Sequence, residues 1–596
     1  MKCCVNKTLS CSIIDSILNK NNNYNGLWVP KKIPIIDKSW LKKINEISNI
    51  DICKHIVKLY LSSEIDEDIL DKITEEAINF DIPLNQLDDN KYILELFHGP
   101  TLAFKDFGAR LLSKICQYLV KECSPKKDYR VIVSTSGDTG AAIADAFRNI
   151  DIPVYIFYPK NKITKYQEKQ ITSCGNNITS FCVEGNFDNC QDKIKEILME
   201  RKYSNVHFIT ANSINIIRII AQACYYFTSY SSLKNIYGDK LDNYKLIYSI
   251  PSGNMGNSSA ALFCKMMGLP IDKILVATNN NQIFTRYLHT GEYSTNKSIK
   301  TISNAMDIGN PSNFKRIISI CHYDLLCVKE HFLSETVDDS ETTKAIQNVY
   351  DEYKYLIDPH TAVGYQAVIK NINRNNCDNK NNLYVILSTA SPYKFREVSP
   401  ISFNLTDSMM KIYNQPSYIF NYHKDVFRKL FEKKTIVLIG MPGSGKTSIA
   451  NILKTKYQWN MIDTDHMMID KHKMNLIDVV NKLGDDFILE EENTILSLKD
   501  IPHYTVISPG GSVVFSQNMM VHLSKLGTII HLDSNIDQLL KRVTNFKERG
   551  IVMKEDETLV DINEQRKHLY QKYRELSINN STLDVDVVAN MFTKLC

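Results

Sequence analysis

Short apolar runs recur along this chain, and each is followed by a glycine-bearing loop or a helical pattern. Alternation of this kind is typical of α/β folds built on parallel sheets. Ligands of such sheets bind beyond the carboxyl ends of the strands, so the loops after these runs are where we expect chemistry. The runs are R-V-I-V-S-T from Arg130, V-Y-I-F-Y-P from Val154, K-L-I-Y-S-I from Lys245, K-I-L-V-A-T-N from Lys273 and L-Y-V-I-L-S-T-A from Leu383.

A second series of apolar runs begins after residue 430 and predicts a separate, small parallel sheet of five strands. Residues 400–434 between the two series are mixed and aromatic, which predicts a packed, helical connection with a domain boundary near residue 430. The runs are T-I-V-L-I-G from Thr435, M-I-D-T-D from Met461, T-V-I-S-P-G-G from Thr505, T-I-I-H-L-D from Thr528 and V-D-V-V-A from Val585.

Composition narrows the class of protein. The 596 residues are 43% hydrophobic and 23% charged, with a formal net charge of only +4, so neither a membrane span nor nucleic-acid binding is expected. The 15 cysteines include no C-x-x-C pair, which argues against zinc ligation and redox dithiols. The first ten residues have neither an apolar secretory core nor an arginine-rich helix, so we expect a cytoplasmic protein.

The segment E-L-F-H-G-P-T-L-A-F-K-D-F-G-A-R, Glu95 to Arg110, places Lys105 between two phenylalanines. A lysine that forms a Schiff base must be partly deprotonated, and apolar neighbours favour the neutral amine. Together with eight further blocks in order, this segment resembles threonine synthase, a pyridoxal-phosphate enzyme of fold type II with two α/β subdomains. The other blocks start at Tyr24, Ser134, Thr210, Ile250, Ala277, Ser303, Asp358 and Leu387.

The resemblance implies that residues 1–90 form the N-terminal region of such an enzyme and residues 91–430 its catalytic region. It also implies that Lys105 binds the cofactor aldehyde and moves protons at the substrate's Cα and Cβ. Asp138 would lie near the cofactor's phenolic oxygen, and Thr389 would hydrogen-bond the pyridine nitrogen. The cofactor phosphate would be bound by the loop Ser252, Gly253, Asn254, Met255, Gly256 and Asn257.

The implied reaction converts O-phospho-L-homoserine and water into L-threonine and phosphate. Four polar residues of the N-S-I-N-I-I-R segment would bind the substrate phosphate, and they are Asn212, Ser213, Asn215 and Arg218. Many family members have a histidine where Ser391 stands here. Some relatives degrade the same phosphoester to 2-oxobutyrate, and that phospho-lyase outcome is the alternative reaction.

A second signature, G-M-P-G-S-G-K-T, follows the strand-like run at Thr435 and precedes a helical pattern. This is the context of a P-loop, whose backbone amides wrap the nucleotide phosphates while the lysine reaches the β- and γ-phosphates and the threonine ligates Mg²⁺. Binding of ATP and Mg²⁺ is therefore expected. The nucleotide-binding residues would be Gly440, Gly443, Ser444, Gly445, Lys446 and Thr447.

Residues 431–596 resemble shikimate kinase, on the P-loop together with I-D-T-D, P-G-G-S-V-V, F-K-E-R-G and Q-R-K-H-L-Y. The resemblance implies a small-molecule kinase. Asp463 would hold Mg²⁺ with Thr447, and Asp465 would act as the catalytic base. Arg549 would close over the nucleotide phosphates, and the acceptor would be bound by Gly510, Gly511 and Arg566.

The chain departs from shikimate kinases in the acceptor site. Ser512 replaces the third glycine of a triple glycine, and Ile488 stands where an arginine follows the phenylalanine. The stretch Glu490–Glu492 is acidic instead, which suits a substrate with an ammonium group but also a solvated helix face. Homoserine and shikimate are both candidate acceptors, and a nucleotide-binding regulatory module without catalysis is the rival interpretation. The oligomeric state is not predicted.

Overall fold

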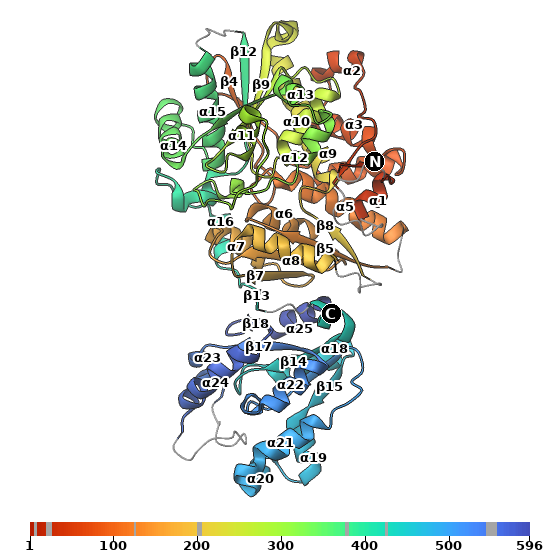
Figure 1. The fold of residues 1–596 in the computed structure, drawn as a ribbon, viewed down its shortest axis with the longest axis vertical. Coiled ribbons are helices and arrows are strands. Elements are labelled where there is room, and N and C mark those ends of the chain that lie inside the picture. Colours follow the sequence, from red (N-terminus) through yellow and green to blue (C-terminus); the bar gives the residue numbers. More distant parts are fainter. Residues whose placement is uncertain are drawn as a thin grey trace.

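The computed structural model describes residues 1–4, 9–18, 27–123, 127–199, 206–375, 381–423, 427–543 and 557–596. The block at Tyr24 begins outside this part of the chain, and Arg549 also lies outside it. Figure 1 shows a larger part, which carries the N-terminus, and a smaller part below it. The C-terminus lies at the junction of the two.

The first sheet of the larger part has six strands in the order β11-β10-β9-β12-β4-β3. All neighbouring strands are parallel except β3 and β4. The predicted runs at Lys245, Lys273 and Leu383 are confirmed as strands of this sheet. Bounds are β3 Leu84–Gln86, β4 Lys91–Glu95, β9 Lys245–Pro251, β10 Lys273–Thr278, β11 Phe332–Thr336 and β12 Asn382–Ser388.

Alternate residues of this sheet face two different helical layers. Along β9, Leu246 and Tyr248 belong to the core shared with α9 and α10, whereas Ile247 belongs to the core shared with α14 and α15. Both faces are therefore covered, as a parallel sheet requires. Bounds are α9 Ile216–Tyr237, α10 Gly256–Met266, α11 Ile283–Thr290, α12 Phe314–Ile320, α13 Leu325–His331, α14 Asp339–Tyr353 and α15 Pro359–Asn375.

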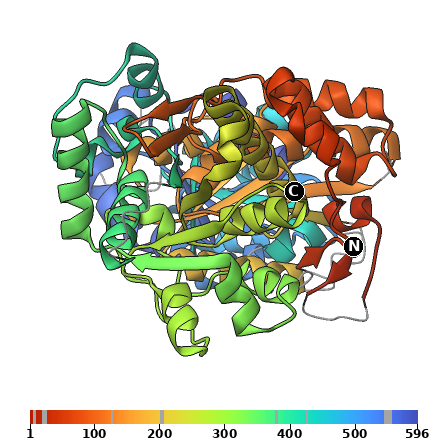
Figure 2. The same cartoon turned by 90° about the horizontal axis from the view of Figure 1, so that it is seen from above.

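The N-terminal segment is mainly helical and packs on α9. Its helices α2 to α4 lie on the side of the molecule opposite α14 (Figures 1 and 2). A short antiparallel pair, β1 with β2, precedes them. Bounds are β1 Lys2–Cys3, α1 Ile13–Leu18, β2 Trp28–Val29, α2 Lys38–Lys42, α3 Asn49–Leu61 and α4 Glu67–Ala77.

Four parallel strands in the order β7-β6-β5-β8 form the second subdomain of the larger part. The predicted runs at Arg130 and Val154 are confirmed here as β5 and β6. Bounds are α5 Lys105–Cys123, β5 Asp128–Ser134, α6 Asp138–Phe147, β6 Val154–Pro159, α7 Lys165–Thr172, β7 Ile178–Val183, α8 Phe187–Met199 and β8 Val206–Thr210.

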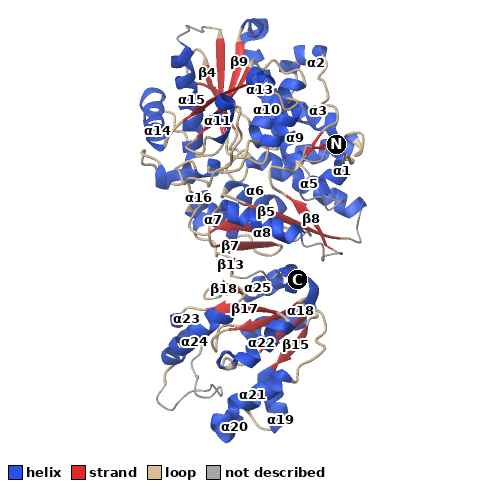
Figure 3. Cartoon of the chain, viewed as in Figure 1, coloured by secondary structure: helices blue, strands red, loops and turns tan. Residues whose placement is uncertain are grey.

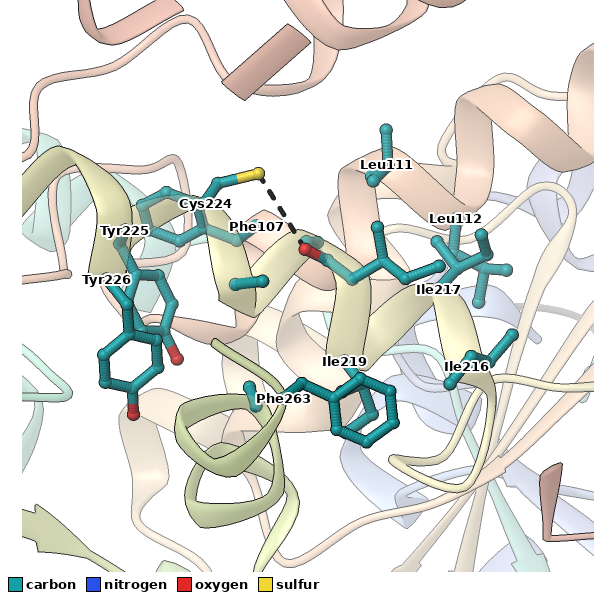
Figure 4. Close-up of a cluster of buried hydrophobic side chains, with 14 of the residues drawn as sticks. Phe107, Leu111, Leu112, Ile216, Ile217, Ile219, Cys224, Tyr225, Tyr226 and Phe263 are labelled. Carbon is teal, nitrogen blue, oxygen red and sulfur yellow. Dashed lines mark hydrogen bonds between the residues drawn. The ribbon is translucent and has the colours of Figure 1, made fainter. Parts of the chain in front are cut away.

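The buried contact between α5, α9 and α10 fixes the start of α5, where Lys105 stands. Phe107 and Leu111 of α5 face Ile217 and Tyr225 of α9, and Phe263 of α10 lies beside them (Figure 4). Helix α9 is buried nearly all round, which is typical of a helix at the centre of a large core. None of the described helices is both long and apolar enough to cross a bilayer.

The smaller part contains five strands, β14 to β18, separated by helices (Figure 3). Ile436 of β14 packs with α18 and α25, whereas Val437 packs with α22 and α24. Bounds are α17 Phe427–Lys433, β14 Thr435–Ile439, α18 Lys446–Tyr457, β15 Asn460–Asp463, α19 Thr464–His472, α20 Leu476–Leu483, α21 Phe487–Leu496, β16 Thr505–Ser508, α22 Gln517–Leu526, β17 Thr528–Asp533, α23 Ile536–Arg542, α24 Leu559–Tyr573, β18 Leu576–Asn579 and α25 Val585–Leu595.

One predicted strand is wrong. Residues 585–589 begin α25 instead of forming a strand, and the fifth strand is β18. Asp584 caps α25 by accepting from the backbone N–H groups of Asp586 and Val587. Val588 and Phe592, four residues apart, then face the core, which is the helical spacing.

The connection between the two parts contains a strand, β13 (Ile419–Tyr422), as well as the expected helices α16 (Asp407–Tyr413) and α17. β13 pairs in parallel with β7 and antiparallel with β18. The sheet of the smaller part is therefore not separate. It continues into the second subdomain as one sheet of ten strands, in the order β15-β16-β14-β17-β18-β13-β7-β6-β5-β8.

The C-terminal residues reinforce this junction. Arg130 of β5 donates to the backbone oxygen of Cys596 at 2.9 Å, and the Tyr155 hydroxyl donates to the backbone oxygen of Lys594 at 2.9 Å. The guanidinium of Arg130 also lies 4.6 Å from the ring centroid of Phe431 in α17. Side chains of the larger part thus bind the end of the smaller part directly.

Candidate active sites

A polar cavity lies where the two subdomains of the larger part meet, around the first residue of α5. Nearly all the predicted residues of the first site line it. Phe104, His360 and Gln222 also contribute. The predicted residues that line the cavity are Lys105, Asp138, Asn212, Ser213, Arg218, Ser252, Gly253, Asn254, Met255, Gly256, Asn257 and Thr389.

The Lys105 amine lies 3.8 Å from Asp138 Oδ2 and 4.8 Å from the ring centroid of Phe104. Burial lowers its pKa, opposed by the charge of Asp138 and assisted by Lys394 and Arg218. A lowered pKa favours the neutral amine, which is the form that acts as a nucleophile and a base.

Asp138 is held between two lysines. Lys394 is fully buried, and its Nζ lies 2.7 Å from Asp138 Oδ1 and donates to the backbone oxygen of Thr101 at 2.8 Å. Gln167 Nε2 also donates to Asp138 Oδ1, at 2.9 Å. Burial favours the neutral acid, yet Lys394 and Lys105 hold the pKa of Asp138 well below its usual range, so the carboxylate is charged.

Lys394 and His360 are functional candidates that the sequence did not single out. Each stands within a block that carries the resemblance, three residues after Ser391 and two after Asp358, but no local pattern separates it from a structural residue. His360 Nδ1 lies 2.6 Å from Asp358 Oδ1, and its Nε2 accepts from the backbone N–H of Ala305 at 3.2 Å. Accepting at Nε2 requires the neutral ring, protonated at Nδ1.

The loop at residues 252–257 leads from β9 into α10. Met255 has a left-handed backbone, with φ of 59°, and no side chain caps the helix that begins at Gly256. A β-carbon on Gly253 would lie 2.7 Å from the Cα of Met306, so only glycine fits against that segment. The uncapped amides at the start of an 11-residue helix suit a phosphate group.

Arg218 also lines the cavity and supplies buried hydrogen-bond donors. Its side chain is 3% exposed, its Nη1 donates to the backbone oxygen of Ala211 at 2.6 Å, and its buried Nε has no partner in the described structure. Burial lowers its pKa to about 10. A buried guanidinium with a spare donor indicates an anionic ligand.

Asn215 does not line the cavity. Its side chain caps α9 by accepting from the N–H of Ile217 at 3.2 Å, and it donates to the backbone oxygens of Thr210 and Ile17. Its position at a strand-to-helix turn explains this role, because asparagine is a favoured N-cap. In this structure Asn215 is a helix cap and, unlike the other three predicted phosphate ligands, does not line the cavity.

These residues fit pyridoxal phosphate. Lys105 would hold its aldehyde carbon and the uncapped start of α10 its phosphate, and Thr389 and Asp138, which line the same cavity, would contact the ring polar atoms.

The second cavity, of about 480 Å³, surrounds the P-loop between β14 and α18. Gly445 has φ of 98° and begins α18 without a side-chain cap. Lys446 Nζ donates to the backbone oxygen of Gly440 at 2.8 Å, and burial lowers its pKa to about 8. Gly443, Gly445, Lys446 and Thr447 line the cavity, whereas Gly440 and the buried Ser444 lie beneath it.

Asp465, Gly510, Gly511 and Arg566 line the other side of the same cavity. Arg542 also lines it and was not predicted. Burial first, and then the neighbouring Asp463, raises the pKa of Asp465 to about 6. Asp463 itself is not among the lining residues, and its Oδ1 caps α19 by accepting from the N–H groups of Asp465 and His466. Arg549, which was expected to close over the nucleotide phosphates, lies outside the described residues.

The acidic stretch divides into two environments. Glu490 pairs with Lys471 and His472, and Glu492 accepts from Ser516 and Asn518, as expected of a solvated helix face. Glu491 differs, because it is 1% exposed and its Oε1 has no partner in the described structure.

Glu491 and Asp465 converge on one point. A β-carbon on Gly510 would lie 2.8 Å from both Asp465 Oδ1 and Glu491 Oε1. Burial and the charge of Asp465 raise the pKa of Glu491 to about 7, while Ser512, which donates to its Oε2 at 2.7 Å, opposes that rise. Two adjacent buried carboxyl groups favour a cationic ligand between them.

Comparison with known proteins agrees with this geometry. The family model for pyridoxal-phosphate dependent enzymes matches residues 82–389, and the model for the threonine synthase N terminus matches residues 7–78. The chain is 35% identical over 414 residues to threonine synthase of Buchnera aphidicola subsp. Schizaphis graminum, covering 68% of this chain and 92% of that protein. The chain belongs to the threonine synthase family.

Other relatives support the same conclusion. Threonine synthase of Escherichia coli K12 is 34% identical over 385 residues, covering 64% of this chain and 85% of that protein. The crystal structure of threonine synthase from Escherichia coli superposes with a TM-score of 0.63 at 30% identity, over 70% of this chain and 95% of that chain. The crystal structure of threonine synthase from yeast superposes with a TM-score of 0.63 at 32% identity, over 69% of this chain and 93% of that chain.

The shikimate kinase family model matches residues 442–596 of the same chain. The expected architecture is thus confirmed: a fold-type II pyridoxal-phosphate enzyme with two α/β subdomains, followed by a shikimate-kinase-like P-loop domain. That domain shares its sheet with the synthase part through β13.

Substituting Lys394 tests the charge arrangement around Asp138. Removing one partner of a buried ion pair typically costs about 3–5 kcal/mol of unfolding free energy, so Lys394→Met should destabilise the apoprotein by that order. The double variant with Asp138→Asn should recover part of the loss, since it also removes the carboxylate that Lys394→Met leaves with Lys105 alone. Urea denaturation measures both.

Lys160→Met is the matched control, because Lys160 pairs with Glu184 at the surface and such pairs contribute about 0–1 kcal/mol. If Lys394→Met were no more destabilising than this control, the assigned pairing would be wrong.

Proposed function

We propose that residues 1–430 convert O-phospho-L-homoserine and water into L-threonine and phosphate, and that residues 431–596 transfer a phosphoryl group from ATP to a small hydroxylated acceptor. The observation that carries the first half is the buried guanidinium of Arg218 in the same cavity as Lys105. That cavity lies within the region matched by the pyridoxal-phosphate enzyme family.

Pyridoxal phosphate, when bound, supplies an electron sink that acidifies the protons on the substrate's Cα and Cβ. Lys105 takes the proton from Cα and then from Cβ, because burial favours its neutral amine. Asp138 remains ionised beside it, held by Lys394. A proton can then be returned to the substrate carbons from the same Lys105 nitrogen.

Arg218 binds the substrate phosphate together with Asn212 and Ser213. Asn212 is anchored to β5, since its Nδ2 donates to the backbone oxygen of Ser134 at 2.8 Å. Ser213 Oγ accepts from Asn254 at 2.7 Å, which links the two phosphate-binding segments. These contacts orient the Cγ–O bond, which breaks as phosphate leaves, and water then adds its hydroxyl at Cβ to give threonine.

Product analysis separates this reaction from the phospho-lyase alternative. The full chain supplied with O-phospho-L-homoserine should release phosphate and threonine in equal amounts. Lys105→Ala should lose both products and the visible absorbance of the bound cofactor, whereas Lys114→Ala, on the exposed face of α5, should retain them. Phosphate release with 2-oxobutyrate in place of threonine would show that the lyase reaction is the correct one.

For the second half, the P-loop residues Gly440 to Thr447 would bind the ATP phosphates, and Thr447 and Asp463 would hold Mg²⁺. Asp465 would take the proton from the acceptor hydroxyl. Its pKa of about 6 makes it ionised at neutral pH and a stronger base than an ordinary aspartate. Arg566, which is 1% exposed at the cavity wall, would bind an acceptor carboxylate.

Glu491 favours homoserine over shikimate as the acceptor. Homoserine carries an ammonium, a carboxylate and a hydroxyl. Arg566 and Asp465 line the cavity, and Glu491, which does not line it, lies beside Asp465 at Gly510. Shikimate has no cation to compensate the two converging carboxyl groups. Phosphorylated homoserine is also the substrate of the synthase half, and a tethered site raises its local supply.

The acceptor can be tested with the synthase half silenced by Lys105→Ala. ADP release should require homoserine and should be weak with shikimate. Loss of one hydrogen bond to a charged group costs about 1.5–3 kcal/mol, so Glu491→Gln should raise the KM for homoserine roughly 10- to 100-fold. Glu492→Gln, on the surface of the same helix, is the control and should leave it unchanged.

ADP release with neither acceptor, despite ATP binding, would instead favour a regulatory module that binds nucleotide without catalysis.

A further inference from the structure

Three metal-binding side chains meet outside both active sites, at the end of α12 and along α13. The ligand atoms of Cys321, Cys327 and His331, one from each residue, all lie within 4.8 Å of one another. No other such group occurs among the described residues. Thiolates and imidazoles around a tetrahedral zinc ion are separated by comparable distances, given zinc–ligand bonds of about 2.0–2.3 Å.

The local fold brings the three together. Cys327 and His331 are four residues apart on α13 and therefore lie on the same face of that helix. Cys321 follows the last residue of α12. The chain then reverses through two consecutive left-handed residues, His322 and Tyr323, with φ of 55° and 64°. Left-handed conformations cost energy for such residues, so the turn that returns Cys321 to α13 is a specified feature.

The side chains have the burial and chemistry of ligands. Cys321 is fully buried, Cys327 is partly exposed, and His331 is 8% exposed with an Nδ1 atom that has no hydrogen-bond partner. A neutral imidazole donates a lone pair to a metal ion, and a cysteine binds one as its thiolate.

We propose that Cys321, Cys327 and His331 bind a zinc ion. Two sulfur ligands and one imidazole are a donor set that zinc prefers, and on binding the two thiols release their protons. The charged groups that act on the cluster are Asp324, Glu330, Lys265 and Lys273. Glu330 is exposed and does not belong to the group, so a water molecule would complete the tetrahedron.

The position indicates a structural role. His331 directly precedes β11, the edge strand of the six-stranded sheet, so the cluster lies at the amino end of that strand. The cofactor loop follows the carboxyl end of β9, which runs parallel to β10 and β11. The zinc ion would therefore hold α12, α13 and the edge strand together without touching the substrate. The sequence argued against zinc because it has no C-x-x-C pair, but the ligands follow a C-x5-C-x3-H spacing instead.

Zinc binding is tested on the full chain, purified with reductant, stripped with a chelator and reloaded with zinc. Elemental analysis should find about one tightly held zinc per chain, and cobalt substitution should give the charge-transfer absorbance of a thiolate-bound metal. Cys327→Ser and His331→Ala should each lose most of the bound zinc. Cys11→Ser, which changes another partly buried cysteine, should retain it.

Zinc should also raise the melting temperature of the stripped wild-type chain but not that of Cys327→Ser, because binding to the folded state stabilises it. Threonine synthase turnover of Cys327→Ser, measured below its melting temperature, checks that this variant is folded. The proposal is overturned if the reduced wild-type chain takes up no more zinc than the folded Cys327→Ser variant. It is overturned equally if cobalt gives no thiolate band. It is also overturned if Cys321 and Cys327 are found as a disulfide and the chain still binds no metal once that disulfide is reduced.

Discussion

The two-site architecture depends on the backbone pairing of a four-residue strand, β13. Strands β7 and β18 would each present an unpaired edge without it, and exposed edges promote aggregation. β13 pairs with the edge of β7 in parallel and with the edge of β18 antiparallel. Its residue Phe420 is fully buried. The contacts of Arg130 and Tyr155 with the last residues of α25 add side-chain hydrogen bonds to the same junction. The second subdomain of the larger part and the smaller part therefore share one continuous sheet.

The two proposed phosphate sites share one structural feature. Helices α10 and α18 each follow a residue with positive φ and have no side-chain cap, so their first amides are available to an anion. Each site also holds a lysine whose pKa is lowered by burial, Lys105 in one and Lys446 in the other. β13 and β18 are antiparallel, so the strands of the smaller part run opposite to β5–β8 in the joined sheet, whereas the loop before α10 follows β9 of the six-stranded sheet. Among the described residues the two cavities share no lining residue, so the proposed reactions are connected only because both sites belong to one chain.

The sequence predicted most of the strands because buried parallel strands are continuous apolar runs that local pattern reveals. It failed at residues 585–589, where an aspartate cap and four-residue apolar spacing outweigh β-branched composition. It also missed β13, since I-F-N-Y becomes a strand only through partners more than 150 residues away on either side.

The candidate sites show the same limit. The glycine loops and Lys105 belong to sequence motifs, so the sequence could predict them. The contacts of Lys394 and His360 and the burial of Glu491 depend on tertiary structure, which no local pattern reveals. Asn215 was assigned to phosphate because of its neighbours in sequence, and its side chain caps a helix instead. Cys321, Cys327 and His331 come together only through a left-handed turn that no sequence motif announces.

We propose that this chain both makes and consumes O-phosphohomoserine. The full chain is supplied with homoserine, ATP, Mg²⁺ and pyridoxal phosphate, and threonine, ADP and phosphate are followed together. We expect equal amounts of all three, with O-phosphohomoserine accumulating in Lys105→Ala and no threonine from Lys446→Met unless that phosphoester is added. Threonine formed from O-phosphohomoserine but none from homoserine and ATP would show that the chain does not make this phosphoester.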